Sequence, residues 1–196
     1  MMRIITGSAR GTKLYTLEGD ATRPTAERAK EAVFSVLQFR ITGRRVLDLF
    51  AGSGQLGLEA LSRGAGYALL CDNSREAVEI IRKNADKTHL SPKCNIKLSD
   101  ALSLLSGLGS SADEKFDMVF LDPPYASGLV PKCLDILYER ELLTHDAVVV
   151  CETARESDPF GTDEKLNDRY EILKKSIYGA ARVTFVQPRH ARDAAE

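Results

Sequence analysis

The strongest indication of chemistry in the chain is the tetrapeptide Asp122-Pro123-Pro124-Tyr125. It ends an apolar run, Phe116–Asp122, that reads as a β-strand, and the two prolines stop the strand and hold its last carbonyls rigidly. The Asp122 carboxylate and the Pro123 carbonyl could each accept one proton of an exocyclic amine and aim its lone pair at an electrophile. Tyr125 could stack on the base that carries the amine, worth roughly 1–3 kcal/mol. The motif therefore predicts alkylation of a base amino group, and a strand terminator with a surface tyrosine is the alternative.

A glycine-rich turn follows an earlier predicted strand, Arg45–Phe50. Gly52, Gly54 and Gly57 form a G-x-G-x-x-G pattern, with Ser53 between the first two glycines. Because glycine has no Cβ, the backbone of such a turn can approach a ligand closely, and the helix that follows can bind an anion at its N-terminus. By itself, the pattern also fits a tight turn that binds nothing.

Acidic residues stand at the ends of three predicted strands: Asp48, Asp72 and Asp100. Asp72 comes 20 residues after Gly52, where a carboxylate can accept the hydroxyl protons of a ribose, as in NAD sites. Asp48 could attract an ammonium group, and Asp100 could accept a hydrogen bond from an adenine amino group. Such a set of carboxylates suits a cofactor with an amino acid and a sulfonium better than one with a pyrophosphate. The sequence thus favours S-adenosylmethionine over NAD.

Short apolar runs alternate with helix-period segments from residue 45 onward, which is typical of βαβ units around a parallel sheet with helices on both faces. Near the C-terminus, two β-prone runs flank Tyr178-Gly179-Ala180 and predict an antiparallel hairpin at one sheet edge. The predicted strands are Arg45–Phe50, Tyr67–Asp72, Asn95–Ser99, Phe116–Asp122, Ala147–Glu152, Tyr170–Ile177 and Ala181–Val186, and the predicted helices are Gly57–Arg63, one capped by Asn73 and Glu76, and Val130–Glu141.

Weaker patterns give further local expectations. Thr25 is expected to cap a helix, and Arg3–Leu17 to form a short strand pair with a glycine-rich turn. Gly107–Asp113 reads as a flexible loop and Thr144-His145 as a loop before the fifth strand. Residues 190–196 read as a frayed tail.

Composition narrows the function classes. The 196 residues carry 27 basic and 28 acidic side chains, a net charge of −1, which argues against a uniformly basic nucleic-acid coat. The four cysteines form no Cys-x-x-Cys pair, and the three histidines fall in no ligand spacing, so no metal is expected. Because neither a signal core nor a membrane span is evident, a cytoplasmic, reduced protein is expected.

Charge is divided unevenly along the chain. Residues 1–45 hold nine basic and four acidic side chains, whereas the remainder has an acidic excess. Beside a methyl-transfer site, such a segment could clamp phosphates, since each contact with Lys or Arg adds sequence-independent affinity. The candidate RNA contacts are Arg10, Lys13, Arg23, Thr25 and Arg28.

The chain resembles a known family at these motifs. The glycine loop with Asp-Pro-Pro-Tyr is similar to class I S-adenosylmethionine-dependent methyltransferases that modify base amino groups. The N-terminal Arg3-Ile4-Ile5-Thr6-Gly7, Arg10-Gly11-x-Lys13-Leu14 and Arg23-Pro24-Thr25-x-x-Arg28-x-x-Glu31-x-x-Phe34 narrow the resemblance to the RsmD family of bacterial 16S ribosomal RNA guanine-N2 methyltransferases.

The resemblance covers nearly the whole chain and implies an α/β, Rossmann-like fold, a seven-stranded, mostly parallel sheet with a reversed last strand. It implies methyl transfer to N2 of one guanine in the small ribosomal subunit or its assembly intermediate. By the same resemblance, Asp72 would hold the ribose, Asp100 and the Ala101 backbone the adenine, and the Gly52–Gly54 loop the methionine moiety. The family more often has Glu at the position of Asp72, Asp at that of Glu27 and Asn at that of Ser35.

The expected organisation is a basic N-terminal extension over residues 1–44, a catalytic domain over 45–189 and the tail, acting as a monomer. An adenine-N6 methyltransferase of DNA or RNA could use the same Asp-Pro-Pro-Tyr geometry. A protein-glutamine methyltransferase would carry Asn in place of Asp122. An NAD-dependent oxidoreductase or a silent nucleotide-binding module would explain the glycines and Asp72 but not the tetrapeptide.

Overall fold

The fold is built on one seven-stranded sheet with the strand order β3-β2-β1-β4-β5-β7-β6. The computed structural model describes residues 2–17, 24–125 and 127–189. Strands β1 to β5 are parallel, and β7 runs antiparallel to both β5 and β6. The strands are β1 (Arg45–Asp48), β2 (Tyr67–Asp72), β3 (Cys94–Leu98), β4 (Phe116–Leu121), β5 (Leu143–Ala154), β6 (Tyr170–Tyr178) and β7 (Ala181–Pro188). The predicted mostly parallel sheet with a reversed last strand is confirmed.

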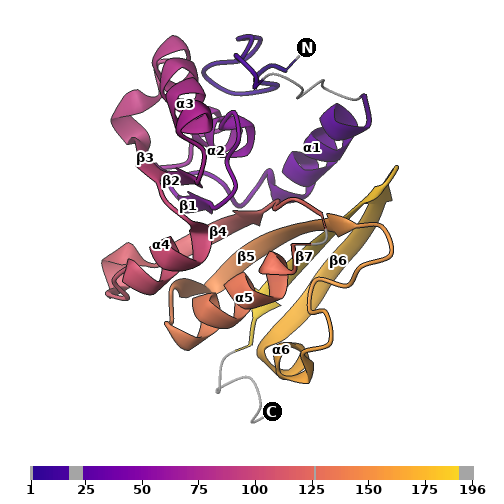
Figure 1. Cartoon of the computed structure of the whole chain (residues 1–196). Helices are drawn as coiled ribbons and strands as arrows, with labels where there is room; N and C mark the ends of the chain where they lie inside the picture. Colours follow the sequence, from indigo (N-terminus) through magenta and orange to yellow (C-terminus); the bar gives the residue numbers. More distant parts are fainter. Residues whose placement is uncertain (1, 18–23, 126, 190–196) are drawn as a thin grey trace.

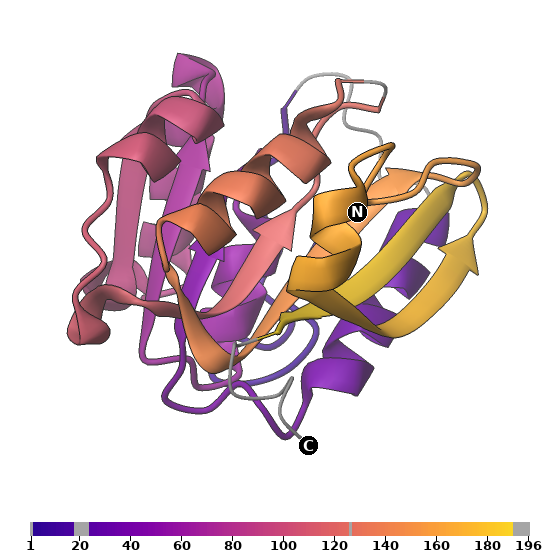
Figure 2. The same ribbon diagram turned by 90° about the horizontal axis from the view of Figure 1, so that it is seen from below.

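Helices cover both faces of this sheet, as the alternating pattern predicted. In Figure 1, α1, α2 and α3 lie on one side of the strands and α4, α5 and α6 on the other, and Figure 2 shows the second layer from below. The helices are α1 (Pro24–Leu37), α2 (Gln55–Ser62), α3 (Arg75–Lys87), α4 (Ala101–Gly107), α5 (Leu129–Glu139) and α6 (Glu164–Arg169), with 3-10 turns at Ser91–Lys93 and Ala112–Glu114. No helix within the described ranges has the length and apolar character to cross a membrane.

The strand order reverses direction between β1 and β4. From β1 the chain moves outward through β2 to β3, and it then returns to place β4 on the other side of β1. In open α/β sheets, a crevice forms at the carboxyl ends of the strands at such a switch point. The topology therefore places the ends of β1 and β4, with the glycine turn and the Asp-Pro-Pro-Tyr motif, beside each other.

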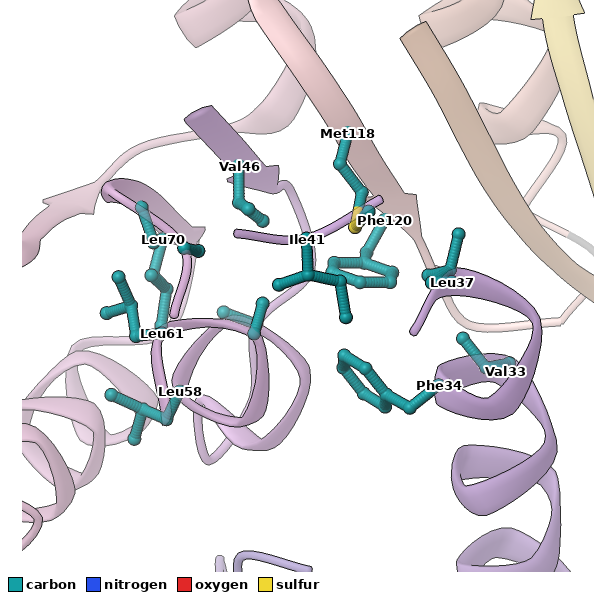
Figure 3. Packing of buried hydrophobic residues seen from close by; sticks show 14 of the residues in the cluster. Val33, Phe34, Leu37, Ile41, Val46, Leu58, Leu61, Leu70, Met118 and Phe120 are labelled. Carbon is teal, nitrogen blue, oxygen red and sulfur yellow. The ribbon is translucent and has the colours of Figure 1, made fainter. Parts of the chain in front are cut away.

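Two apolar clusters, one on each face, hold the sheet between its helices. On the α1 face, Phe34 of α1 packs on Phe120 of β4, with ring centroids 5.8 Å apart. Figure 3 shows these rings beside Ile41 and Leu37, while Leu58 and Leu61 of α2 face Leu70 of β2. Thus α1 is part of the same core as the glycine-loop helix α2.

Two predicted helix caps are wrong. Ser74, not Asn73, caps α3, because its side chain accepts a hydrogen bond from the Ala77 amide. Helix α1 begins at Pro24, so Thr25 lies inside its first turn rather than at the cap. Proline is favoured at a first helical position because its fixed φ fits the helix and no N–H is needed there.

Three loop predictions also need correction. Strand β5 begins at Leu143, so the Thr144-His145 segment is strand and not loop. Leu143 pairs with Phe116, and the next pair is Met118 with Val148, so the irregularity leaves extra residues on β5. Between Arg3 and Leu17 the strand pair reduces to a single antiparallel bridge, Arg3 to Lys13. The predicted loop Gly107–Asp113 begins as the last residue of α4 and ends in a 3-10 turn.

Candidate active site

A cleft of about 740 Å³ opens at the carboxyl ends of the five parallel strands β1 to β5. The N-terminal segment and α1 form its opposite wall through Met2, Arg3 and Lys30. Nine of the ten predicted catalytic and cofactor residues line it: Asp48, Gly52, Ser53, Asp72, Asp100, Ala101, Asp122, Pro123 and Tyr125. The structure thus brings together motifs that lie far apart in sequence.

The glycine loop turns sharply into α2 with its backbone facing the cleft. Gly52 has φ of 54°, and a Cβ placed there would meet nothing within 4 Å, whereas one on Gly57 would come within 2.8 Å of Leu70. The first glycine therefore supports the turn, and Gly57 allows the helix to pack closely on β2. Gly54, the tenth predicted residue, is buried with φ of 80° at the start of α2.

Asp48 is a buried carboxylate with one oxygen unsatisfied. Its side chain is 1% exposed, and Oδ2 accepts a hydrogen bond of 3.0 Å from the Gly57 amide. Oδ1 is buried, and no group among the described residues meets hydrogen-bond geometry with it. Burial, opposed in part by the Gly57 amide, raises the pKa of Asp48 to about 7. An unsatisfied carboxylate oxygen at a cleft wall is costly unless a donor or cation reaches it.

Asp72 makes backbone contacts that the sequence did not reveal. Its Oδ2 accepts a hydrogen bond of 2.8 Å from the Gly52 amide, and its Oδ1 accepts one of 2.9 Å from the Ser74 amide. The carboxylate therefore ties the glycine loop to the start of α3. Since each oxygen can accept more than one hydrogen bond, the predicted ribose contact stays possible.

Asp100 has a structural role beside its predicted one. It is the N-cap of α4, and its Oδ1 accepts a hydrogen bond of 3.0 Å from the Ser103 amide. The next residue, Ala101, is buried and begins the helix. Both residues line the cleft just after the carboxyl end of β3.

The Asp-Pro-Pro-Tyr segment leaves β4 and crosses the floor of the cleft. Asp122 is half-buried, Pro123 is buried, and Tyr125 is 48% exposed. The Tyr125 hydroxyl donates a hydrogen bond of 2.9 Å to Oε1 of Glu152, at the end of β5. Glu152 lines the same cleft, although its place in the sequence marks it only as the end of a predicted strand. Burial raises the pKa of Glu152.

The structure describes three of the five side chains that are predicted to contact RNA. Arg10, Lys13 and Arg28 are exposed. Arg23 and the side chain of Thr25 lie outside the described residues.

A buried charge cluster fastens the N-terminal segment to α2, which begins at the glycine loop. Glu59 of α2 is fully buried, and its carboxylate accepts hydrogen bonds from the amides of Ile5 and Thr6, at 2.7 and 3.0 Å. It also pairs with Lys30 of α1 at 3.2 Å and with Arg63 at 2.8 Å. With four donors, the charge is compensated, as a buried carboxylate requires. No group of three or more His, Cys, Asp or Glu residues that could hold a metal occurs in the described part.

Comparison with known proteins identifies relatives along almost the whole chain. The family model described as "Conserved hypothetical protein 95" matches residues 2–187. "Ribosomal RNA small subunit methyltransferase D" of Haemophilus influenzae is 34% identical over 181 residues, 91% of this chain and 89% of that protein. The protein of the same name in Escherichia coli is 35% identical over 156 residues, 80% of this chain and 76% of that one. These matches confirm the resemblance to the RsmD family.

A solved structure confirms the fold. The Escherichia coli protein described as "Putative methyltransferase yhhF" superimposes with a TM-score of 0.81 at 30% identity, covering 96% of this chain and 98% of that one. The class I methyltransferase fold is thus shared across the cleft and the C-terminal hairpin.

Proposed function

This chain belongs to the family described as "Conserved hypothetical protein 95", and on that premise we propose that it transfers a methyl group from S-adenosylmethionine to N2 of a guanine in 16S ribosomal RNA. The substrate class comes from the relatives, which are named as methyltransferases of the small ribosomal subunit. The observation that carries the reaction type is the placement of Asp122 and Pro123 in one cleft with the glycine loop and Asp48.

The cleft residues fit the proposed cofactor. Oδ1 of Asp48 is buried and has no hydrogen-bond partner in the described part of the chain, as expected for a carboxylate that receives the ammonium group of an amino acid. Asp72 would hold the ribose hydroxyls, and Asp100 with the Ala101 backbone would hold the adenine. The Gly52–Gly54 loop would approach the methionine moiety. When bound, S-adenosylmethionine supplies a methyl carbon activated by a positively charged sulfur.

Asp122 and Pro123 act on the nucleophile. A guanine amine is weakly nucleophilic because its lone pair is delocalised into the ring. If the Asp122 carboxylate and the Pro123 carbonyl each accept one amine hydrogen, the nitrogen becomes more tetrahedral and its lone pair points at the methyl carbon. A neutral thioether is already a good leaving group, so positioning supplies most of the acceleration. The guanine must leave its stack to enter, and Tyr125 can stack on its face.

The exposed basic residues of the N-terminal segment hold the RNA backbone in this proposal. Arg10, Lys13 and Arg28 are exposed; Lys13 is bridged to Arg3 of the cleft wall, and Arg28 lies on α1, which supplies Lys30. Arg23 and Thr25, in the same stretch of sequence, would join them. Contacts of this kind fix the register of the RNA without reading its sequence.

Tritiated methyl transfer tests the proposal. Small ribosomal subunits from a strain that lacks the enzyme are incubated with labelled S-adenosylmethionine, and the labelled nucleosides are identified after digestion. The expected product is N2-methylguanosine at one position. Subunits from the parent strain, already methylated, serve as the control and should take up little label. Label in N6-methyladenosine would contradict guanine N2 as the methylated position and would still agree with S-adenosylmethionine as the methyl donor.

A further inference from the structure

Glu152 lies beside Asp122 at the ends of two neighbouring parallel strands. In the register of β4 and β5, Leu121 is paired with Cys151, and Asp122 and Glu152 are the residues that follow. Phe120 and Val150, one pair earlier, both belong to the apolar cluster on the α1 face. Because side chains alternate along a strand, Asp122 and Glu152 project to that same face, from strands about 4.8 Å apart.

The two acids line two hollows in common. Both line the large cleft and a smaller hollow of about 70 Å³ between α1 and the sheet. A ligand group held by Asp122 therefore lies within reach of Glu152. Glu152 is partly buried, so a bound group that offers an N–H donor would replace hydration that its carboxylate has lost.

Tyr125 fixes the orientation of the Glu152 carboxylate. Its hydroxyl donates to Oε1 at 2.9 Å. A carboxylate has about four lone-pair sites, so one hydrogen bond leaves both oxygens able to accept more. The same tyrosine that is expected to stack on the base thus orients an acid at the edge of that base.

The Watson–Crick edge of guanine matches this pair of acids. Guanine carries a hydrogen on N1 next to the N2 amine, so it offers adjacent donors along one edge. Adenine and 2-aminopurine have a bare N1 that is an acceptor. If a bare N1 faces a carboxylate, two acceptors meet and neither receives a hydrogen bond. A site built to accept a hydrogen bond from N1 therefore rejects bases without that hydrogen strongly.

We propose that Glu152 accepts the N1–H of the guanine whose N2 amine is held by Asp122 and Pro123, and that it thereby makes the site select guanine. This inference rests on the proposed function. It assigns Glu152 a specificity role, separate from the orientation of the amine by Asp122.

Replacement of one base in the substrate tests this role. The methylated nucleotide is first located, and small subunits are then reconstituted with either guanosine or 2-aminopurine riboside there; both carry an amine on C2. Wild type should prefer guanosine in kcat/KM by about 100-fold or more. In Glu152→Gln, the amide can accept from N1–H or donate to a bare N1, so the preference should fall to about tenfold or less.

Tyr125→Phe is the matched comparison, because it removes the hydroxyl on Glu152 and keeps the ring. It should slow both substrates and, because the carboxylate is still present, retain more of the preference than Glu152→Gln does. Calorimetry with S-adenosylhomocysteine verifies that each variant is folded. Comparable use of both bases by wild type, or an equal loss on both in Glu152→Gln, would overturn the inference alone. Absence of N2-methylguanosine with wild type and the guanosine substrate would overturn the proposed function itself.

Discussion

At the residue scale, Asp48 and Asp72 are two carboxylates of one cleft with different electrostatic settings. Both oxygens of Asp72 accept a backbone amide, at 2.8 and 2.9 Å. Asp48 is 1% exposed, and one oxygen accepts the Gly57 amide, whereas the second meets no hydrogen-bond donor within the described ranges. The pKa of Asp48 is consequently raised to about 7, so a fraction of the molecules carries a protonated Asp48 at neutral pH.

This setting predicts that cofactor affinity depends on pH through Asp48. A bound ammonium group needs the ionised carboxylate, so binding below pH 7 must displace a proton from Asp48. The affinity for S-adenosylhomocysteine should therefore rise about tenfold between pH 5.5 and pH 7, following a group whose pKa is about 7. Calorimetry in buffers of different ionisation enthalpy would also detect the released proton.

Asp48→Asn is the control for the pH dependence, because it keeps the shape and removes the titration. Its affinity should be lower at pH 7 and nearly flat over the same range. The stability of the fold depends on pH in the opposite direction to the cofactor affinity. The native state binds the Asp48 proton more tightly than the unfolded state does. The contribution of Asp48 to the free energy of unfolding therefore decreases as the pH rises from about 4 to about 7. A pH-independent affinity in wild type would refute an ammonium contact.

At the element scale, the N-terminal segment is attached to the two helices that support the glycine loop. Glu59 of α2 accepts the amides of Ile5 and Thr6. Buried Asn84 of α3 accepts the Tyr15 amide and donates to the carbonyls of Tyr15 and Ser53, at 3.0 and 2.9 Å. One amide side chain thus connects the proposed RNA-binding segment with the proposed cofactor loop.

Two glycines in this segment give a matched pair of variants. Gly7 and Gly11 both have positive φ, 90° and 83°, so alanine is strained at either position. A Cβ on Gly7 would lie 1.8 Å from the Ser62 carbonyl oxygen, whereas one on Gly11 would meet nothing within 4 Å. Gly11→Ala should lower the free energy of unfolding by about 1–2 kcal/mol, the cost of a left-handed alanine.

Gly7→Ala should cost at least about 2 kcal/mol more than Gly11→Ala, because the backbone of α2 or of the segment must move. Urea unfolding of both variants measures the difference. Equal losses would mean that the segment does not pack on Ser62 as the structure shows.

Strands with a clear apolar pattern were predictable from the sequence, whereas the ends of strands with polar residues were not. The run Tyr67–Asp72 is apolar and ends in an acid, and β2 has these same bounds. The start of β5 was missed because Thr144 and Asp146 are polar; they are held in the strand by Arg44 and Asp117, which meet them only in the folded chain. Local sequence does not contain such long-range partners.

At the scale of the whole molecule, the site is assembled from the ends of five strands and from the N-terminal segment. The motifs at Asp48, Asp72, Asp100 and Asp122 were recognisable because each acid lies toward the end of a predicted strand or just after it. Glu152 also ends such a strand, but its importance comes from Tyr125 on the neighbouring strand. The roles of these residues toward cofactor and base stay predictions, for which the shared cleft is the physical support.

The central claim is that two acids of one cleft have separate roles: Asp122 orients the base amine, and Asp72 binds the cofactor. The most direct measurement compares Asp122→Ala and Asp72→Ala, each by methyl transfer to small subunits and by calorimetry with S-adenosylhomocysteine. Asp122→Ala should lower turnover by about 100- to 1000-fold, the cost of losing one positioned transition-state contact, while its affinity for S-adenosylhomocysteine changes little. Asp72→Ala should do the reverse, with weakened affinity and turnover restored at saturating cofactor. Equal losses of cofactor affinity in the two variants would contradict the claim.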